Sequence, residues 1–212
     1  MIVSHPARVL FVHVQKTGGS TVQSVLLDRL PGAEKLAGLP GAKHAHLAAA
    51  LERQPELAAY WTFGFVRNPW ARLWSWWSMI DRRQGQRDEG HAWATRRIDS
   101  NAFWSGVLEL GSFEAFVLEG PERFERLRTP QLDYLRAGDR RADLIGRTES
   151  FGADLARACD RLGVDSPPEA PRRNADRSGG PSGSYRDHYT PAMRDRVAEL
   201  YADDVDEFGY EF

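Results

Sequence analysis

The stretch VLFVHVQKTGGSTV, residues 9–22, constrains the fold more than any other part of the chain. Its apolar first half predicts a buried strand, and its glycine pair predicts a tight turn. The hydroxyl pair that follows opens an amphipathic segment, which predicts a helix. Such a junction presents backbone N–H groups and a positive dipole end, and here also Lys16, at one point. We therefore predict an anion-binding site at this turn.

Composition limits the classes of protein to which the chain can belong. With 212 residues, 42% hydrophobic residues and seven tryptophans, it can bury a substantial core, and we predict one domain over residues 1–212. A lone cysteine, Cys159, excludes a disulfide framework and a multi-cysteine metal site, which favours a cytoplasmic protein. No apolar run approaches the roughly 20 residues of a membrane span, and no signal peptide is recognisable. The net charge of -2 does not favour a nucleic-acid partner.

Apolar patterns alternate between strand and helix periods along the chain. A helix is expected at 20–30, and the aromatic run at 60–66 predicts a second buried strand. Other elements are expected as helices at 47–57, near 113–117, at 151–162 and from Pro191 to Gly209, and as a strand end at 143–146. This alternation predicts an α/β fold with a central parallel sheet covered by helices on both faces.

Two segments depart from this alternation. The charged stretch within 81–104 is typical of a variable, solvated helical excursion or of a mobile loop. Residues 167–184 are rich in Pro, Gly, Ser and Arg, which predicts a lid loop.

A second strand-to-helix junction lies in the sequence FVRNPWARLWSWW, residues 65–77. Proline suits the first helical position, so a helix is expected to begin at Pro69. Arg67 comes directly after the buried strand, and Ser75 follows on the helix. The tryptophans at helical spacing are expected to pack in the core with Leu73, and they are Trp70, Trp74 and Trp77.

The two junctions together resemble the motifs of one enzyme family. The first turn is not a Walker A loop, since its lysine precedes the glycines and the chain holds no GxxxxGK[ST]. FVHVQKTGGSTV instead resembles the 5′-phosphosulfate loop, and FVRNPWARLWSWW the 3′-phosphate motif, of sulfotransferases that use 3′-phosphoadenosine 5′-phosphosulfate (PAPS). The chain is most similar to the sulfotransferase family 2 type, which contains heparan sulfate 2-O- and 6-O-sulfotransferases and small bacterial relatives.

The resemblance extends over most of the chain. GRTESFGADLARACDRLGV, residues 146–164, is similar to the GRxE segment of the family, and the stretch from Tyr185 is similar to its terminal segment. Gln131 resembles a recurrent position near the site. Gln15 stands where the family usually has proline, so this chain departs from the pattern directly before the lysine.

The resemblance implies a P-loop-like three-layer fold and a role for each motif. Lys16 would neutralise the 5′-phosphate and the bridging oxygen, leaving 3′-phosphoadenosine 5′-phosphate (PAP) as the product, with no metal required. Arg67 and Ser75 would hold the 3′-phosphate, since an arginine fork donates two hydrogen bonds at once. The residues implied to bind PAPS are Lys16, Thr17, Gly18, Gly19, Ser20, Thr21, Arg67 and Ser75.

The acceptor hydroxyl must also lose a proton, and histidine titrates nearest to physiological pH. Heparan sulfate sulfotransferases carry a catalytic histidine between the two motifs, where this chain has His44 and His46. We predict His46 as the catalytic base and His44 as the reserve, with a histidine that merely caps the helix at 47–57 as the alternative. His13 is expected to be a core residue, and Glu149 is a weaker candidate for the base.

The predicted function is transfer of the sulfuryl group from PAPS to a hydroxyl of a carbohydrate or small-molecule acceptor. Animal relatives are tethered to secretory membranes, whereas this chain shows no tether, so we expect a soluble bacterial enzyme that modifies a cytosolic glycan precursor or a secondary metabolite. One alternative is a P-loop-like nucleotide or small-molecule kinase, which would need a Walker lysine and a magnesium-binding acid. The other is a nucleotide-binding module without catalysis.

Overall fold

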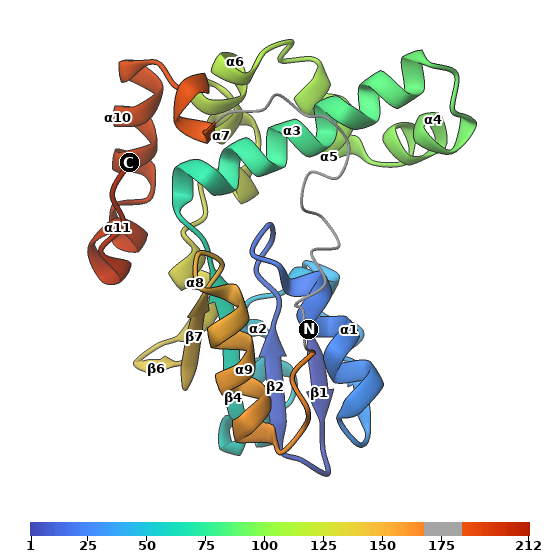
Figure 1. Cartoon of the computed structure of the whole chain (residues 1–212), viewed down its shortest axis with the longest axis vertical. Coiled ribbons are helices and arrows are strands. Elements are labelled where there is room, and N and C mark those ends of the chain that lie inside the picture. The colour runs from blue at the N-terminus through green and yellow to red at the C-terminus, as the bar shows by residue number, and fades with distance from the viewer. Residues whose placement is uncertain (168–183) are drawn as a thin grey trace. The chain divides into compact units, whose positions relative to one another are not determined.

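The computed structural model describes residues 1–167 and 184–212, and these residues form two compact units (Figure 1). The first unit consists of residues 1–67 and 131–167, and the second contains the remainder of the described residues. That the two units act as one domain stays a prediction. The expected lid loop falls almost wholly outside the described residues.

A five-stranded sheet lies at the centre of the first unit. Its strands are β1 (Ile2–Ser4), β2 (Val9–Val12), β3 (Ala33–Lys35), β4 (Trp61–Val66) and β7 (Leu144–Arg147). Across the sheet the order is β3-β1-β2-β4-β7. β2, β4 and β7 are parallel, and their register aligns Phe11 with Phe63 and Phe63 with Leu144. β1 is antiparallel to both of its neighbours.

The sheet is therefore mixed, and the prediction of a wholly parallel sheet is wrong. The chain returns from β1 to β2 through a short turn, in which the Arg8 N–H donates to the His5 carbonyl oxygen at 3.2 Å. A connection this short joins antiparallel strands, because a parallel pair needs a long crossover. The apolar residues at the N-terminus thus form a strand of their own, β1, which lies between β3 and β2.

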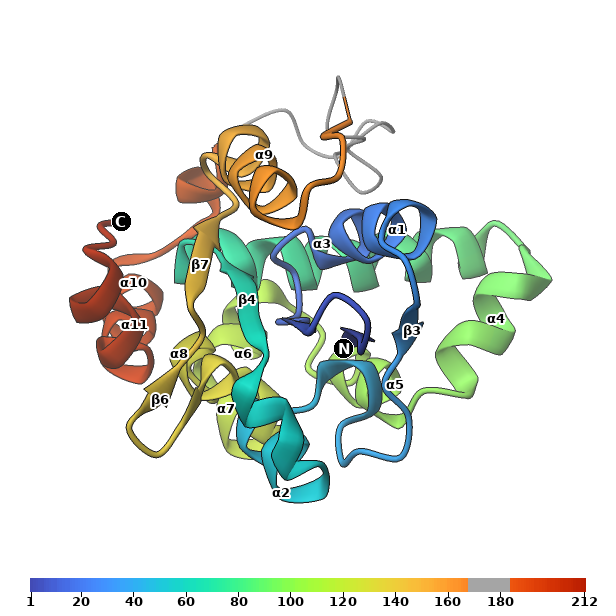
Figure 2. The ribbon, with the colours of Figure 1, turned by 90° about the horizontal axis from the view of Figure 1, so that it is seen from below.

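Helices cover both faces of this sheet, as predicted (Figure 2). One face carries α1 (Gly19–Arg29) and α9 (Phe151–Leu162), and the other carries α2 (Leu47–Arg53) and α8 (Gln131–Leu135). On the first face Val25 and Leu155 pack with Phe11 and Phe63 in one buried cluster. The first unit is therefore a three-layer α/β arrangement.

The helix expected at 47–57 is divided. α2 ends at Arg53, and a 3-10 helix, η2 (Pro55–Ala59), follows it. Pro55 explains the break, because proline has no N–H to continue the α-helical hydrogen bonds. A second 3-10 helix, η1 (Ala42–His44), precedes α2.

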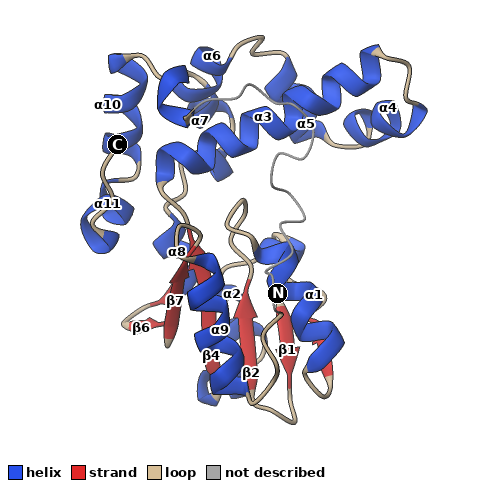
Figure 3. Ribbon diagram, viewed as in Figure 1, coloured by secondary structure: helices blue, strands red, loops and turns tan. Residues whose placement is uncertain are grey.

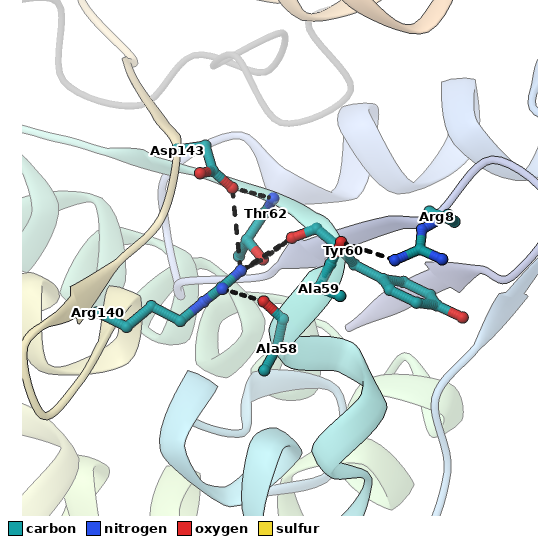
Figure 4. Close-up of polar contacts among 7 residues, drawn as sticks. All are labelled: Arg8, Ala58, Ala59, Tyr60, Thr62, Arg140 and Asp143. Carbon is teal, nitrogen blue, oxygen red and sulfur yellow. Dashed lines mark hydrogen bonds and ion pairs between the residues drawn. The ribbon is translucent and has the colours of Figure 1, made fainter.

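An arginine fastens a small hairpin to the amino end of β4 (Figure 4). The hairpin consists of β5 (Arg136–Ala137) and β6 (Arg140–Arg141). Arg140 Nη2 donates to the Tyr60 carbonyl oxygen at 2.8 Å and to Thr62 Oγ1 at 3.1 Å. Asp143 Oδ2 accepts the Thr62 N–H at 2.7 Å. These contacts secure the end of β4 that is opposite to the predicted anion-binding turn.

The second unit is helical throughout its described residues (Figure 3). Its α-helices are α3 (Pro69–Asp88), α4 (Ala92–Asp99), α5 (Ala102–Leu108), α6 (Phe113–Leu118), α7 (Gly120–Arg123), α10 (Pro191–Leu200) and α11 (Ala202–Phe208). Short 3-10 helices lie at η3 (Glu125–Leu127) and η4 (Tyr185–His188). The charged segment at 81–104 is the helical excursion, and the mobile-loop alternative is wrong.

The apolar face of α3 differs in phase from the prediction. Trp70, Leu73 and Trp76 are buried, whereas Trp74 and Trp77 are only half-buried. The helix begins at Pro69 as expected. The tryptophan stripe therefore packs in the core, but Trp76 replaces two of its predicted members as the buried anchor.

The terminal helix is interrupted. Thr190 caps its start by accepting the Met193 N–H at 3.3 Å, and Gly209 ends it with a φ of 60°, as predicted. Between them Tyr201 leaves the helical conformation at a φ of -116°. Its buried hydroxyl donates to the Leu127 carbonyl oxygen, so a tertiary contact accompanies the break between α10 and α11.

Candidate functional site

The turn between β2 and α1 holds a lysine in an uncommon backbone conformation. Lys16 has a φ of 69° and Gly18 a φ of 80°, both in the left-handed region. Glycine adopts this region freely, whereas a lysine must be held there by its surroundings. A Cβ atom on Gly19 would lie 2.2 Å from His13 Cδ2, so only glycine fits. The predicted strand, glycine turn and helix are confirmed.

Internal hydrogen bonds brace this turn. Thr17 Oγ1 donates to the Val14 carbonyl oxygen at 3.0 Å, and the Thr21 N–H donates to the Gly18 carbonyl oxygen at 2.9 Å. Thr17 and Thr21 are buried, whereas Ser20 is exposed. The N-cap residue of α1 is Gly18, which has no side chain with which to cap the positive end of the helix dipole.

Gln131 clamps the backbone at the end of β4. Its Oε1 accepts the Arg67 N–H at 2.9 Å, and its Nε2 donates to the Arg67 carbonyl oxygen at 2.8 Å. Gln131 is fully buried and Arg67 is half-buried. The paired bonds fix the peptide units from which the Arg67 side chain projects.

Three basic residues follow the parallel strands: Lys16 after β2, Arg67 after β4, and Arg147 at the end of β7. The Thr148 N–H donates to the Val66 carbonyl oxygen at 2.8 Å, which ties the last two strand ends together. Since the carboxyl ends of parallel strands meet at one edge of a sheet, this edge carries positive charge from three elements.

A buried carboxylate organises the turn after β7. Asp154 Oδ2 accepts the Arg147 N–H at 2.8 Å and the Ser150 hydroxyl at 2.7 Å, and its Oδ1 accepts Arg157 Nη1 at 3.0 Å. Burial raises the pKa of Asp154, but these hydrogen bonds and the Arg157 charge outweigh it, so the pKa is lowered. Asp154 thus stays ionised and holds the junction that follows the third strand.

His46 lies directly before α2, where the sequence predicts the base. Its ring centroid is 4.1 Å from that of Tyr134, and the two planes are inclined by 36°. The His46 side chain makes no capping hydrogen bond to α2, so the helix-capping alternative is wrong. His44 Nδ1 is 2.8 Å from the His13 carbonyl oxygen. A carbonyl only accepts, so Nδ1 carries the proton and a neutral His44 keeps its lone pair on Nε2.

His13 is a buried residue, as predicted for a core histidine. Burial, followed by the nearby His44, lowers the pKa of His13 well below its usual value of 6.5. Its Nδ1 has no hydrogen-bond partner among the described residues. The neutral ring packs over Gly19, and its centroid is 4.6 Å from that of His44. His13 therefore links the glycine turn to the histidine segment.

Ser75 lies on α3 in the second unit, where it is half-buried, so its partnership with Arg67 of the first unit stays a prediction. In the described ranges, no three His, Cys, Asp or Glu side chains gather in a way that would hold a metal ion. Nor does any helix in those ranges have the length and apolar character needed to cross a membrane.

A protein-family model described as the sulfotransferase family matches residues 1–211 of the chain. The chain belongs to the sulfotransferase family. Its type is sulfotransferase family 2, and it is accordingly a transferase. Searches of curated proteins and of solved structures gave no match.

The donor set of this sulfotransferase fits a ligand with several negative charges. Gly18 and Gly19 lack Cβ atoms where the Phe151 and His13 side chains pack, so these rings can lie directly against the turn and hold its shape. Lys16, Arg67 and Arg147 supply positive charge at the same edge. A dianionic 5′-phosphosulfate and a 3′-phosphate carry the complementary charge.

Sequence reasoning missed Tyr134 in this sulfotransferase and gave Gln131 only a weak role. Both lie on α8, three residues apart and therefore on one face of a single helical turn. Tyr134 contacts the His46 ring, and its hydroxyl donates to Gln15 Oε1 at 3.3 Å. Their shared helical face was the signal in the sequence for Tyr134, and Gln131 also resembled a recurrent family position; their partners lie far away along the chain.

Proposed function

We propose that the chain is a PAPS-dependent sulfotransferase that transfers the sulfuryl group to a hydroxyl of a carbohydrate or small-molecule acceptor. The observation that carries the proposal is Lys16, held in a left-handed conformation between the end of β2 and the start of α1. The family match and the basic edge of the sheet support the same function. The kinase alternative lacks a Walker lysine in the sequence.

The first turn would bind the 5′ end of the donor. PAPS supplies an activated sulfuryl group and leaves as PAP. Lys16 neutralises negative charge at the 5′-phosphate and the bridging oxygen, which is where charge grows as the bond to sulfur breaks. The backbone amides from Thr17 to Thr21, with the hydroxyls of Ser20 and Thr21, hold the phosphate oxygens. Gly18 and Gly19 permit the turn that presents these amides.

The second motif would bind the 3′-phosphate, which distinguishes PAPS from ATP. The Arg67 guanidinium donates two hydrogen bonds to it, and the Ser75 hydroxyl donates a third. Gln131 restrains the Arg67 backbone, which reduces the conformational freedom lost when the ligand binds. Because lysine and arginine supply the positive charge, we propose that turnover needs no metal.

His46 would accept the proton of the acceptor hydroxyl. It lies between the two motifs in sequence, and its side chain is not used to cap α2. His44 is the reserve, because its Nε2 keeps a lone pair while Nδ1 is engaged with the His13 carbonyl. Glu149, which is exposed in the turn after β7, is the third choice. We propose a cytosolic glycan precursor or a secondary metabolite as the acceptor.

An acceptor screen with sulfur-labelled PAPS tests this function. We expect the wild-type protein to label at least one carbohydrate or metabolite hydroxyl, and Lys16→Ala to abolish labelling. His46→Ala should retain PAP binding and lose turnover. Full activity of His46→Ala would transfer the role of base to His44 or Glu149. PAP binding without label transfer to any acceptor would support the non-catalytic module, and magnesium-dependent phosphoryl transfer from ATP would support the kinase.

A further inference from the structure

One helical turn, α8, contacts several parts of the candidate site at once. Gln131 holds the backbone of Arg67, and Tyr134 contacts both Gln15 and His46. The turn itself is firmly seated, because Leu135 is fully buried and its Cδ2 would lie 2.3 Å from a Cβ atom at Gly64. A glycine in β4 therefore allows α8 to lie close against the sheet.

Tyr134 contacts both the loop that carries Lys16 and the proposed base, His46. Its hydroxyl donates to Gln15 Oε1 at 3.3 Å, and Gln15 is the residue directly before Lys16. Its ring lies against the His46 ring, with 4.1 Å between the centroids. Tyr134 is only 3% exposed, so its own position is fixed by packing. Residues that are distant along the chain thus meet on one buried side chain.

We infer that Tyr134 is a positioning residue that sets the orientation of His46 and restrains the loop that carries Lys16. The inference rests on the proposed function, because it assigns Tyr134 to the donor loop and the base of that same site. Tyr134 itself touches neither the donor nor the acceptor in this role.

Both contacts meet a physical need of the site. Lys16 is held at a positive φ, a conformation that costs about 1–3 kcal/mol and persists only when neighbours restrain it. The hydrogen bond to Gln15 restrains the adjoining residue. His46 makes no capping bond to α2, and the packing of the Tyr134 ring against it limits the rotation of the His46 ring. A base must be aimed at the proton that it accepts.

A double-mutant cycle tests the restraint of the loop. Tyr134→Phe removes the hydroxyl and keeps the ring, and Gln15→Leu removes its acceptor. We expect each single variant to bind PAP about fivefold more weakly in calorimetry, the effect of one hydrogen bond. The double variant should bind no more weakly than either single variant. Tyr60→Phe is the matched control, because it removes a hydroxyl 2.8 Å from His5 Nδ1 outside the site, and its PAP affinity should be unchanged.

A spectroscopic measurement tests the orientation of His46 without relying on activity. The Tyr134 ring current shields the His46 ring protons, so Tyr134→Leu should move their NMR signals downfield, whereas Tyr134→Phe should keep them near the wild-type positions. The signals are assigned by their loss in His46→Asn. In turnover assays we expect Tyr134→Phe to raise the KM for PAPS and Tyr134→Leu to lower kcat in addition.

The inference would be overturned by wild-type PAP affinity in Tyr134→Phe, or by His46 signals that do not move in Tyr134→Leu. Additive losses in the cycle would also reject it, since they would show that Gln15 and Tyr134 act independently. The proposed function fails separately if the wild-type protein does not bind PAP. In that case the NMR comparison still decides whether Tyr134 orients His46.

Discussion

The two strand-to-helix junctions of this chain offer different groups to a ligand. After β2, the N-cap residue of α1 is Gly18, which has no side chain to cap the helix, and the turn consists largely of glycine and small residues. After β4, Asn68 Oδ1 accepts the N–H groups of Trp70 at 3.1 Å and Ala71 at 3.3 Å, and Pro69 has no N–H to offer. The first junction can bind an anion through its backbone, whereas the second must use side chains such as Arg67.

This difference explains the residue types at each junction. Binding through backbone amides requires a turn of fixed shape, which Gly18 allows through its positive φ and Gly19 allows by leaving room for the His13 ring. Binding through a side chain instead requires that the backbone carrying the side chain is held in place. Gln131 does this by hydrogen bonding to the Arg67 N–H and carbonyl oxygen. The capped helix after Asn68 can therefore begin with proline and a large tryptophan.

The largest difference between the two junctions should appear when one methyl group is added to the first junction. In Gly19→Ala the new Cβ would overlap the buried His13 ring, which should cost about 3 kcal/mol of unfolding free energy, the upper end for overpacking, and abolish PAP binding. Chemical denaturation and calorimetry measure the two effects. Gly152→Ala on α9 is the control, because no atom lies within 4 Å of its Cβ position. Retained PAP binding in Gly19→Ala would show that the close packing of His13 against the turn is not needed for binding.

A smaller effect is expected from removing the clamp at the second junction. Gln131→Leu leaves the Arg67 N–H and carbonyl without their buried partner, which should cost about 2 kcal/mol of unfolding free energy. PAP affinity should fall, while affinity for adenosine 5′-phosphate (AMP), which lacks the 3′-phosphate, should fall less. Gln131→Glu keeps the acceptor and loses only one bond, so it should lie between Gln131→Leu and the wild type. An equal loss of affinity for PAP and AMP would contradict the idea that Gln131 supports binding of the 3′-phosphate through Arg67.

The Asn68 cap of the second junction should contribute to the unfolding free energy and not to the preference for PAP over AMP. Asn68→Ala removes the acceptor for two N–H groups and should lower the unfolding free energy by about 1 kcal/mol. If the ligand contact is made by side chains, the ratio of PAP to AMP affinity should stay within about twofold of the wild type, a difference below 0.5 kcal/mol. A collapse of that ratio would mean that the backbone of this junction also contacts the ligand.

The smallest effect is expected at the third junction, after β7, where removing the Asp154 carboxylate should change how the unfolding free energy depends on pH. The pKa of Asp154 lies below its ordinary value of 3.8 in the folded protein, so its contribution is full above that value and is lost as the pH falls through the folded pKa. Asp154→Asn should therefore be less stable than the wild type at neutral pH, and the two should converge in acid. Denaturation curves at several pH values measure this, and a constant difference at all pH values would contradict it.

Local patterns predicted the elements that carry the site. The glycine turn, the strand before Arg67 and the whole of α9 follow from hydrophobic period and capping residues, which act over a few residues. The antiparallel β1 was missed because its apolar run is only three residues long, and the SHPAR segment after it, residues 4–8, was not recognised as a turn. Trp76 was missed because packing against neighbouring helices, rather than spacing alone, sets which face of α3 is buried.

The contacts of α8 could not be predicted from local sequence. Gln131 and Tyr134 act on Arg67, Gln15 and His46, and these pairs meet only because β4 carries the chain back to the same edge of the sheet. The exposed or buried state of a polar side chain depends on such tertiary contacts. Gln131 is an example, since this fully buried glutamine holds the Arg67 backbone through two hydrogen bonds.

Calorimetry with PAP and AMP tests the central claim, that two junctions bind two phosphates by different means. The wild-type protein should bind PAP at least about tenfold more tightly than AMP, since a charged hydrogen bond contributes about 1.5–3 kcal/mol. Arg67→Ala should remove the preference for PAP, and Lys16→Ala should weaken the binding of PAP and AMP by the same factor. Equal affinity of the wild-type protein for PAP and AMP, or a preference that survives in Arg67→Ala, would contradict the account.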